Sequence, residues 1–239
     1  MSVLARIRTM LRSYNYELYT RPYELNIVGI RSTSVKPNKF DDEIHVFFKT
    51  SSGSWEHFVF SATTDPGTFW LLQPMMPQGT AILAQGQYKN AYAIGLHRGQ
   101  YYALTQIRKV TVIRDYNRNA VLDFYNGVYD TGNFGINIHR AYAIGETKYV
   151  DKYSAGCQVF EDASDFNLFM ALCERHRKFY GNAFTYTLLD FRALRRATVK
   201  RWMVGLTAGG ILLALAFPFL KEKIQMLLNS TDHVRIKES

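Results

Sequence analysis

Cysteine is scarce in this chain: Cys157 and Cys173 are the two that occur in 239 residues. Two cysteines are too few for a disulfide framework, and no Cys/His spacing typical of a metal site is present. A stripe of Lys and Arg interleaved with aromatics, a helix-turn-helix pattern and zinc-finger spacing are also absent. We therefore expect no metal, no organic cofactor and no nucleic-acid partner, and the net charge of +9 favours anionic lipid or an anionic polymer such as a cell wall.

The N-terminus, MSVLARIRTMLRSYNY, lacks the uninterrupted apolar run of a secretory signal peptide. Leu4, Ile7 and Leu11 recur at helical spacing, which predicts a short amphipathic helix within a lead-in of residues 1–22. We expect this helix to pack on the following domain, and contact with a membrane surface is the alternative.

Aromatic residues are abundant, and the chain from Glu24 to about Tyr125 consists of short apolar segments separated by turn signals. Segment YELNIVGIRS predicts a strand, EIHVFFKT and WEHFVFSAT around SSGS predict a hairpin, and TAILAQGQY, AYAIGLH, YYALTQI and KVTVIRD predict further strands. Strands at this spacing indicate a mainly β domain, either a sandwich or a barrel, within residues 23–191.

One helix is predicted inside that domain, in the segment ASDFNLFMALCERHRKFY from Ala163 to Tyr180. Ser164 or Asp165 can cap its start, and Gly181 can end it. Cys173 lies on the apolar face of this helix, so we interpret it as a buried core residue. FTYTLLDF, which follows, predicts a last strand.

A run of 19 uncharged residues, 202–220, follows a basic linker at 192–201. A helix of this length spans roughly 28 Å, close to the thickness of a hydrocarbon core. We therefore predict a single C-terminal transmembrane helix in membrane lipid, with residues 221–239 as a polar tail; a buried core helix is the alternative. Gly205 and Gly209 form a small-residue face that suits a homodimer in lipid.

Basic residues are concentrated on the N-terminal side of this run, in residues 192–201. The positive-inside rule then places the preceding domain on the cytoplasmic side, with the run acting as a tail anchor.

The residues with the clearest catalytic potential lie in the segment GINIHRAYAIGETKYVDKYSAGCQVF, residues 135–160. A thiol is a strong nucleophile as the thiolate, and an imidazole such as that of His139 can take the proton of Cys157. Gly156 lets the backbone approach a bound carbonyl, and the amides of Gly156 and Cys157 could point at an oxyanion. Ser154 could brace the loop or bind the substrate. The alternative is a buried structural thiol on a tight turn.

This segment resembles the catalytic motif of the L,D-transpeptidases, which have a YkuD-like fold, because a histidine is followed by a Ser-x-Gly-Cys loop. Here 17 residues, 140–156, lie between His139 and Cys157. ATTDPGTF is similar to the family's Thr-Pro-x-Gly stretch on the substrate side. The resemblance implies a YkuD-like β-sandwich with one packed helix. It also implies that Cys157 is the nucleophile, that His139 is its base, and that the Arg140 carbonyl orients the imidazole ring.

The implied function is cysteine-dependent acyl transfer on peptidoglycan stem peptides or their precursors, with cross-linking or hydrolysis as the outcome. The family's second histidine, which precedes the Gly-Cys pair, is replaced by Ala155. That difference motivates a rival interpretation, a membrane-anchored structural or phage virion protein that keeps the fold without activity. A cysteine amidase or peptidase acting on another peptide is a third alternative.

Three further positions carry predictions. His97, between Gly95 and Gly99, could contact substrate at the rim of a cleft, although an exposed or hydrogen-bonded histidine is the alternative. Gln158 follows the nucleophile and is a candidate substrate contact. The segment DYNRNAVLD, residues 115–123, has polar residues at offsets like those of a calcium loop, but it lacks the required Gly and Glu, so we predict a hairpin turn.

Overall fold

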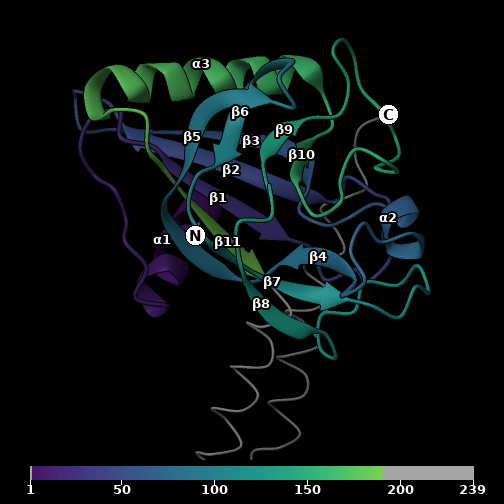
Figure 1. Ribbon diagram of the computed structural model, residues 1–239. Helices are drawn as coiled ribbons and strands as arrows, with labels where there is room; N and C mark the ends of the chain where they lie inside the picture. The colour runs from purple at the N-terminus through teal and green to yellow at the C-terminus, as the bar shows by residue number, and fades with distance from the viewer. Residues whose placement is uncertain (1, 191–239) are drawn as a thin grey trace, which may run out of the picture. The chain divides into compact units, whose positions relative to one another are not determined.

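The computed structural model describes residues 2–190, and Figure 1 shows the arrangement of their helices and strands. The chain divides into two compact units, residues 1–192 and 193–239. The predicted basic linker (192–201), transmembrane helix (202–220) and polar tail (221–239) lie outside the described residues. Among residues 2–190, no helix combines the length and the apolar character needed to cross a membrane.

Eight strands close into a barrel in the order β1-β11-β5-β6-β9-β10-β3-β2. The pairs β1–β11 and β9–β10 are parallel, and the other neighbours are antiparallel. The strands are β1 (Asn26–Arg31), β2 (Asp42–Lys49), β3 (Trp55–Thr63), β5 (Gly86–His97), β6 (Tyr101–Gln106), β9 (Ile138–Arg140), β10 (Gln158–Phe160) and β11 (Phe184–Asp190).

A second, three-stranded sheet lies beside the barrel in the order β4-β7-β8, and both of its pairings are antiparallel. Its strands are β4 (Thr80–Leu83), β7 (Val110–Asp115) and β8 (Val128–Gly132). The predicted segment TAILAQGQY is therefore divided between two sheets, because β4 ends at Leu83 and the long strand β5 begins at Gly86. Strand β4 pairs with β7, whereas β5 pairs with β11 and β6, so the two strands belong to different sheets.

Three helices are described: α1 (Val3–Ser13), α2 (Thr68–Leu72) and α3 (Ala163–Tyr180). The amphipathic α1 packs on the domain as predicted, because Ile7 and Leu11 are buried in one cluster with side chains of β1, β2 and β11. Helix α3 lies across the top of the barrel in Figure 1 and has the predicted bounds. Its N-cap is Asp162 and not the predicted Ser164 or Asp165, because the Asp162 carboxylate accepts from the first free amides of the helix.

The main hydrophobic core fills the barrel and continues into the face of α3. Cys173 belongs to this core and is fully buried, as its place on the apolar face of the helix predicts. The prediction of a mainly β domain is confirmed. The predicted β-sandwich is not found, because eight strands close into a barrel, which is the other arrangement that the strand spacing indicates.

A buried cation occupies the end of β1. The guanidinium of Arg31 is 1% exposed, pairs with Asp65 at 2.8 Å, and donates to the hydroxyl and the carbonyl of Thr64. Burial of such a charge is tolerated when its donors are paired. These contacts hold the start of the segment ATTDPGTF (62–69) against the barrel, and this segment leads directly to α2.

Candidate functional site

Parallel pairing of β9 and β10 explains the spacing between the two predicted catalytic residues. A parallel pair needs a crossover connection of about a dozen residues or more, and residues 141–157 supply it. In the register, His139 lies opposite Val159, which is two residues beyond Cys157. The period of two along a strand then places Cys157 and His139 on the same face of neighbouring strands.

A network of hydrogen bonds determines the shape of the cysteine loop. The Ser154 hydroxyl donates to the Cys157 carbonyl at 2.8 Å and accepts the Gly156 amide at 3.1 Å, and this side chain is fully buried. Gly156 has φ +122°, where a side chain is strained, and a Cβ there would collide with the carbonyl oxygen of Ala81 in β4. The loop therefore requires glycine at this position, and Ser154 braces it.

The segment ATTDPGTF and the residue that follows it, Trp70, contact the region of the cysteine loop. The Gly67 amide donates to the Ser154 carbonyl at 2.9 Å, and the indole N–H of Trp70 donates to the Lys152 carbonyl at 3.1 Å. Two segments that lie far apart in the sequence are thus joined next to Cys157.

The Cys157 sulfur is held by backbone groups of the residues before β9. The Asn137 amide donates to Sγ at 3.4 Å, and the thiol donates to the Gly135 carbonyl at 3.4 Å. Burial raises the pKa of this thiol, and the Asn137 amide and the positive charge of Arg98 act in the opposite direction. In the resting protein the thiol is therefore protonated near neutral pH.

His139 is buried in a defined tautomer. Its Nδ1 lies 2.9 Å from the Arg140 carbonyl and 3.4 Å from the Tyr101 hydroxyl. A carbonyl can only accept, so Nδ1 carries the proton and Nε2 has the free lone pair. Burial, reinforced by the neighbouring His97, lowers the pKa of His139 to about 3, so the imidazole is neutral.

The two predicted catalytic groups are brought to neighbouring strands but are not hydrogen-bonded to each other. Within residues 2–190, His139 Nε2 is buried and has no hydrogen-bond partner, sulfur included. A neutral thiol and a neutral imidazole are therefore present in this structure, and not a thiolate–imidazolium pair. Catalytic hydrogen bonds are often loose before substrate binds, so proton transfer requires a closer approach of the two side chains.

His97 is a buried neighbour of His139. Its ring stacks on that of His139 with centroids 4.2 Å apart, and its Nδ1 accepts from the Asn137 side-chain amide at 3.0 Å. The orientation of Asn137 is set because its side-chain oxygen accepts the Gln106 backbone amide at 2.9 Å. The proton of neutral His97 is consequently on Nε2, the opposite tautomer to His139.

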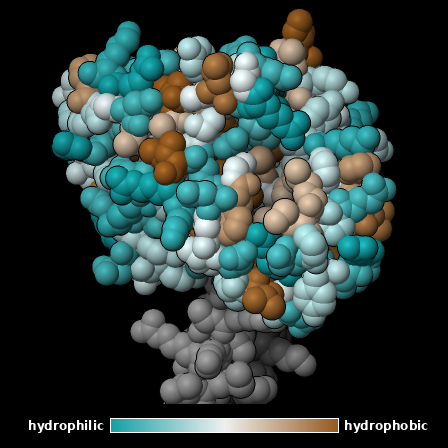
Figure 2. All heavy atoms as spheres, in the orientation of Figure 1, coloured by the Kyte–Doolittle hydropathy of each residue, from teal (hydrophilic) through white to brown (hydrophobic). Residues whose placement is uncertain are grey.

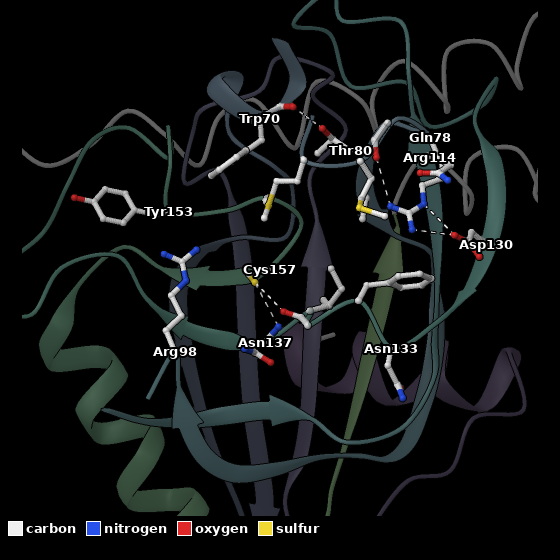
Figure 3. A pocket seen from close by; sticks show the side chains of 18 of the residues that line it. Trp70, Gln78, Thr80, Arg98, Arg114, Asp130, Asn133, Asn137, Tyr153 and Cys157 are labelled. Atoms are coloured by element: carbon white, nitrogen blue, oxygen red, sulfur yellow. Dashed lines mark hydrogen bonds and ion pairs between the residues drawn. The ribbon is translucent and has the colours of Figure 1, made fainter. Parts of the chain in front are cut away.

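A cavity of about 750 Å³ opens beside the sulfur, and both His97 and Cys157 line it. His97 is also hydrogen-bonded, as the alternative interpretation has it, and its contact with substrate stays a prediction. Figure 2 shows this face hollowed between the region of β9 and β10 and that of α2. Apolar and polar side chains both line the cavity, and Figure 3 labels most of the polar ones. The larger apolar side chains are those of Trp70, Met75, Met76, Phe134 and Ile136.

Two groups that the sequence assigned to the site, the Gln158 side chain and the Gly156 amide, are hydrogen-bonded within the protein. Gln158 is fully buried, its side-chain amide donates to the Gly156 carbonyl at 3.2 Å, and its oxygen accepts from the Tyr186 hydroxyl at 2.8 Å. It therefore belongs to the inside of the barrel, because β10 turns this side chain inward, and the predicted substrate contact is not found. The Gly156 amide is bound by Ser154, which leaves the Cys157 amide as the donor available to an oxyanion.

The sequence interpretation missed Tyr101, Asn137 and Arg98. Asn137 precedes His139 by two residues in the segment NIH, so the strand period could have placed both on one face. Arg98 and Tyr101 belong to the hairpin HRGQY, whose Gly marks the turn that pairs His97 with Tyr101. These local signals were present in the sequence. The pairing of β6 with β9, which brings Tyr101 close to His139, depends on closure of the barrel and is not visible in a local pattern.

The segment 115–123 is a hairpin connection between β7 and β8, as predicted. Its polar groups bond to one another: Asp115 accepts the Asp123 amide at 2.9 Å, and Asn117 accepts the Asn119 amide at 3.3 Å. In the part of the chain that the structure describes, no group of three or more His, Cys, Asp or Glu side chains is arranged to hold a metal ion.

Comparison of the chain with models of protein families, with curated proteins and with solved structures finds no match.

Proposed function

We propose that this chain catalyses cysteine-dependent acyl transfer of the L,D-transpeptidase type. The observation that carries the proposal is the tautomer of His139, whose Nδ1 proton is held by the Arg140 carbonyl while the Nε2 lone pair is unprotonated and makes no hydrogen bond. This is the form a general base needs, and it lies on the strand next to the Cys157 loop.

The reaction begins from the neutral pair. Cys157 Sγ attacks the carbonyl carbon of the donor amide while its proton passes to His139 Nε2. The oxyanion that forms accepts a hydrogen bond from the Cys157 amide. The imidazolium then protonates the leaving amine, the C–N bond breaks, and a thioester remains. An acceptor amine or water, deprotonated by His139, attacks the thioester and releases the thiol.

The stacked ring of His97 disfavours a stable imidazolium at His139, because His97 lowers the pKa of that group. Proton transfer is therefore coupled to attack on the substrate and does not precede it. This arrangement protects the resting thiol, since the thiolate is the form that reacts with oxidants and electrophiles.

The proposal includes a YkuD-like fold. It is supported by the contact of Gly67, in the segment similar to the family's Thr-Pro-x-Gly stretch, with Ser154 of the cysteine loop. The position of the family's second histidine is Ala155, which lines the cavity. His97 from β5 supplies an imidazole on the same cavity wall.

For the substrate we propose peptidoglycan stem peptides or their precursors. For the location we propose a single C-terminal membrane anchor at 202–220, with the catalytic domain facing the cytoplasm. A substrate on that side would be a precursor, or the enzyme would meet the wall after lysis or delivery by a virion.

The direct test incubates the full-length protein in detergent with defined muropeptides and identifies products by mass. Transpeptidation is expected to give a cross-linked product with loss of the donor's terminal residue, and hydrolysis gives the shortened donor alone. Cys157→Ala is the control. Product formed equally by the Cys157→Ala variant would contradict the proposal.

A second candidate is a membrane-anchored structural or phage virion protein without activity. The observation that favours it is the lack of a hydrogen bond between His139 Nε2 and the sulfur. Intact mass after acid quenching separates the two, since an enzyme accumulates an acyl group on Cys157 and an inert protein does not. A cysteine amidase acting on another peptide would form the same adduct with a different donor.

A further inference from the structure

Arg98 stands at the tip of the hairpin between β5 and β6, directly after His97. Its backbone has φ +51° and that of Gly99 has φ +71°, which makes a tight turn closed by the hydrogen bond from the Gln100 amide to the His97 carbonyl at 3.0 Å. A non-glycine residue in this conformation is uncommon and costs free energy. The strained turn projects the Arg98 side chain over the cavity.

The cavity holds one positive charge that is not compensated. Arg114 lies on the opposite side and donates twice to Asp130, at 2.9 and 3.1 Å, so these two charges cancel. The Arg98 guanidinium forms no ion pair and no hydrogen bond with any residue from 2 to 190. Figure 3 shows it directed toward the space between Cys157 and Tyr153.

The electrostatic effect of Arg98 reaches the reacting groups. Its charge opposes the rise in the pKa of Cys157 that burial causes, and it lowers the pKa of both His97 and His139. A guanidinium that acts on the sulfur from within the cavity is also close enough to act on a group bonded to the carbonyl that the sulfur attacks.

We infer that Arg98 is a binding residue for an anionic acyl donor, whose carboxylate it holds beside the reacting carbonyl while the apolar wall of the cavity receives the donor's uncharged part. The planar guanidinium presents parallel N–H donors that match a carboxylate. This inference rests on the proposed function for its reaction, but the charge selectivity of the cavity can be measured without turnover.

The first test uses two thiol reagents with the same reactive group and opposite charges. Sulfonatoethyl methanethiosulfonate is anionic, and trimethylammonioethyl methanethiosulfonate is cationic. The rate of modification of Cys157 is measured for each by peptide mass, and the ratio of the anionic to the cationic rate is compared between proteins. A change in the thiol pKa alters both rates equally and cancels in this ratio.

Arg98→Gln is expected to lower the ratio about fivefold or more, since each reagent feels the lost charge with opposite sign. Arg118→Gln is the matched control, because it removes the same charge from the loop between β7 and β8, outside the cavity lining. Its ratio should change less than about twofold. An unchanged ratio in Arg98→Gln, or an equal fall in both variants, would overturn the inference.

The second test uses two muropeptide donors that differ in one group, a carboxylate beside the scissile amide or its carboxamide. The full-length protein should prefer the carboxylate about tenfold or more in kcat/KM, and Arg98→Gln should lose that preference while still turning over the carboxamide. Equal preference in the two proteins would contradict the inference. Absence of product from both donors together with a shifted reagent ratio would instead contradict the proposed function alone.

Discussion

The two thiols of this protein lie in contrasting environments. Cys173 lies on α3 within the main core, is fully buried, and its pKa is raised well above the ordinary value by burial and by the charge of Glu174. Cys157 is half-buried on a loop, accepts an amide hydrogen bond from Asn137, and lines the cavity. Burial raises the pKa of both thiols, so burial alone does not distinguish a core residue from a nucleophile.

The difference lies in what surrounds each sulfur. Around Cys157 are a donor for the developing thiolate, a cation, and a neutral imidazole with an unpaired lone pair. Cys173 is fully buried within the main hydrophobic core and does not line the cavity. Access from the cavity and nearby polar groups, and not a lowered resting pKa, distinguish the proposed nucleophile from the core thiol.

The largest expected difference between the two thiols is in the rate of turnover when each is replaced. Cys157→Ala is expected to reduce acyl transfer on muropeptides by at least about a thousandfold, because the nucleophile is lost. Cys173→Ala should retain activity within a few-fold. Product formation is measured by mass, and circular dichroism checks that both variants are folded. Loss of activity in Cys173→Ala alone would reverse the assignment.

His139→Gln is expected to lower kcat by about a hundredfold or more, the range for a lost general base. Glutamine can still donate to the Arg140 carbonyl but cannot take the proton of Cys157. Initial rates across pH 5 to 9 are the measurement. A variant with an unchanged rate and pH profile would show that another group, with His97 as the first candidate, accepts the proton.

The buried neutral state of His139 predicts a pH dependence of stability. Its pKa is about 3 in the folded protein and about 6.5 when unfolded, so the unfolded chain binds the extra proton as pH falls between these values. This contribution is complete above about pH 6.5 and is lost toward pH 3, at up to about 1.4 kcal/mol per pH unit.

Urea unfolding at pH 7, 5.5 and 4.5 measures this effect. His139→Gln should show a shallower loss of unfolding free energy than the wild-type protein over that range. Equal slopes in the two proteins would mean that His139 is not held neutral in the folded state.

The smallest expected effect concerns the core thiol. Cys173→Ala removes a fully buried sulfur and should cost about 1 to 2 kcal/mol of unfolding free energy, from the lost contacts and the small cavity. Cys157→Ala should cost less, because that side chain is half-buried beside a cavity that already exists. A larger loss of unfolding free energy in Cys157→Ala than in Cys173→Ala would show that the Cys157 side chain stabilises the fold.

Much of the fold could be predicted from local patterns. Alternating apolar residues located most long strands of the barrel, and helical spacing located α3 from Ala163 to Tyr180. Strands β8, β9 and β10 and helix α2 were not predicted. Strands β9 and β10 have three residues each, and β8 and α2 have five each, so these elements are too short to show a periodicity of their own.

The site could be predicted only in part, because some of its residues have a local signal and others depend on strand pairing. His139 and Cys157 were found because their residue types and spacing carry chemistry, and the Ser-x-Gly-Cys loop depends on local hydrogen bonds. Gln158 was misplaced, because a sequence does not show which face of β10 turns into the barrel. Arg98 and Tyr101 were missed because hairpin pairing brings them to the site from another part of the chain.

Closure of the barrel between β6 and β9 rests on a single register pair, Leu104 with Ile138, whereas β5 and β6 pair along the whole stretch from Tyr92 to His97. Local opening has a lower free energy where few backbone hydrogen bonds must break. Native-state hydrogen exchange should therefore be faster for amides along this seam than for those of β2 and β3. His139 lies in β9, next to that seam, so hydrogen exchange there would report on the mobility of the strand that carries the proposed base.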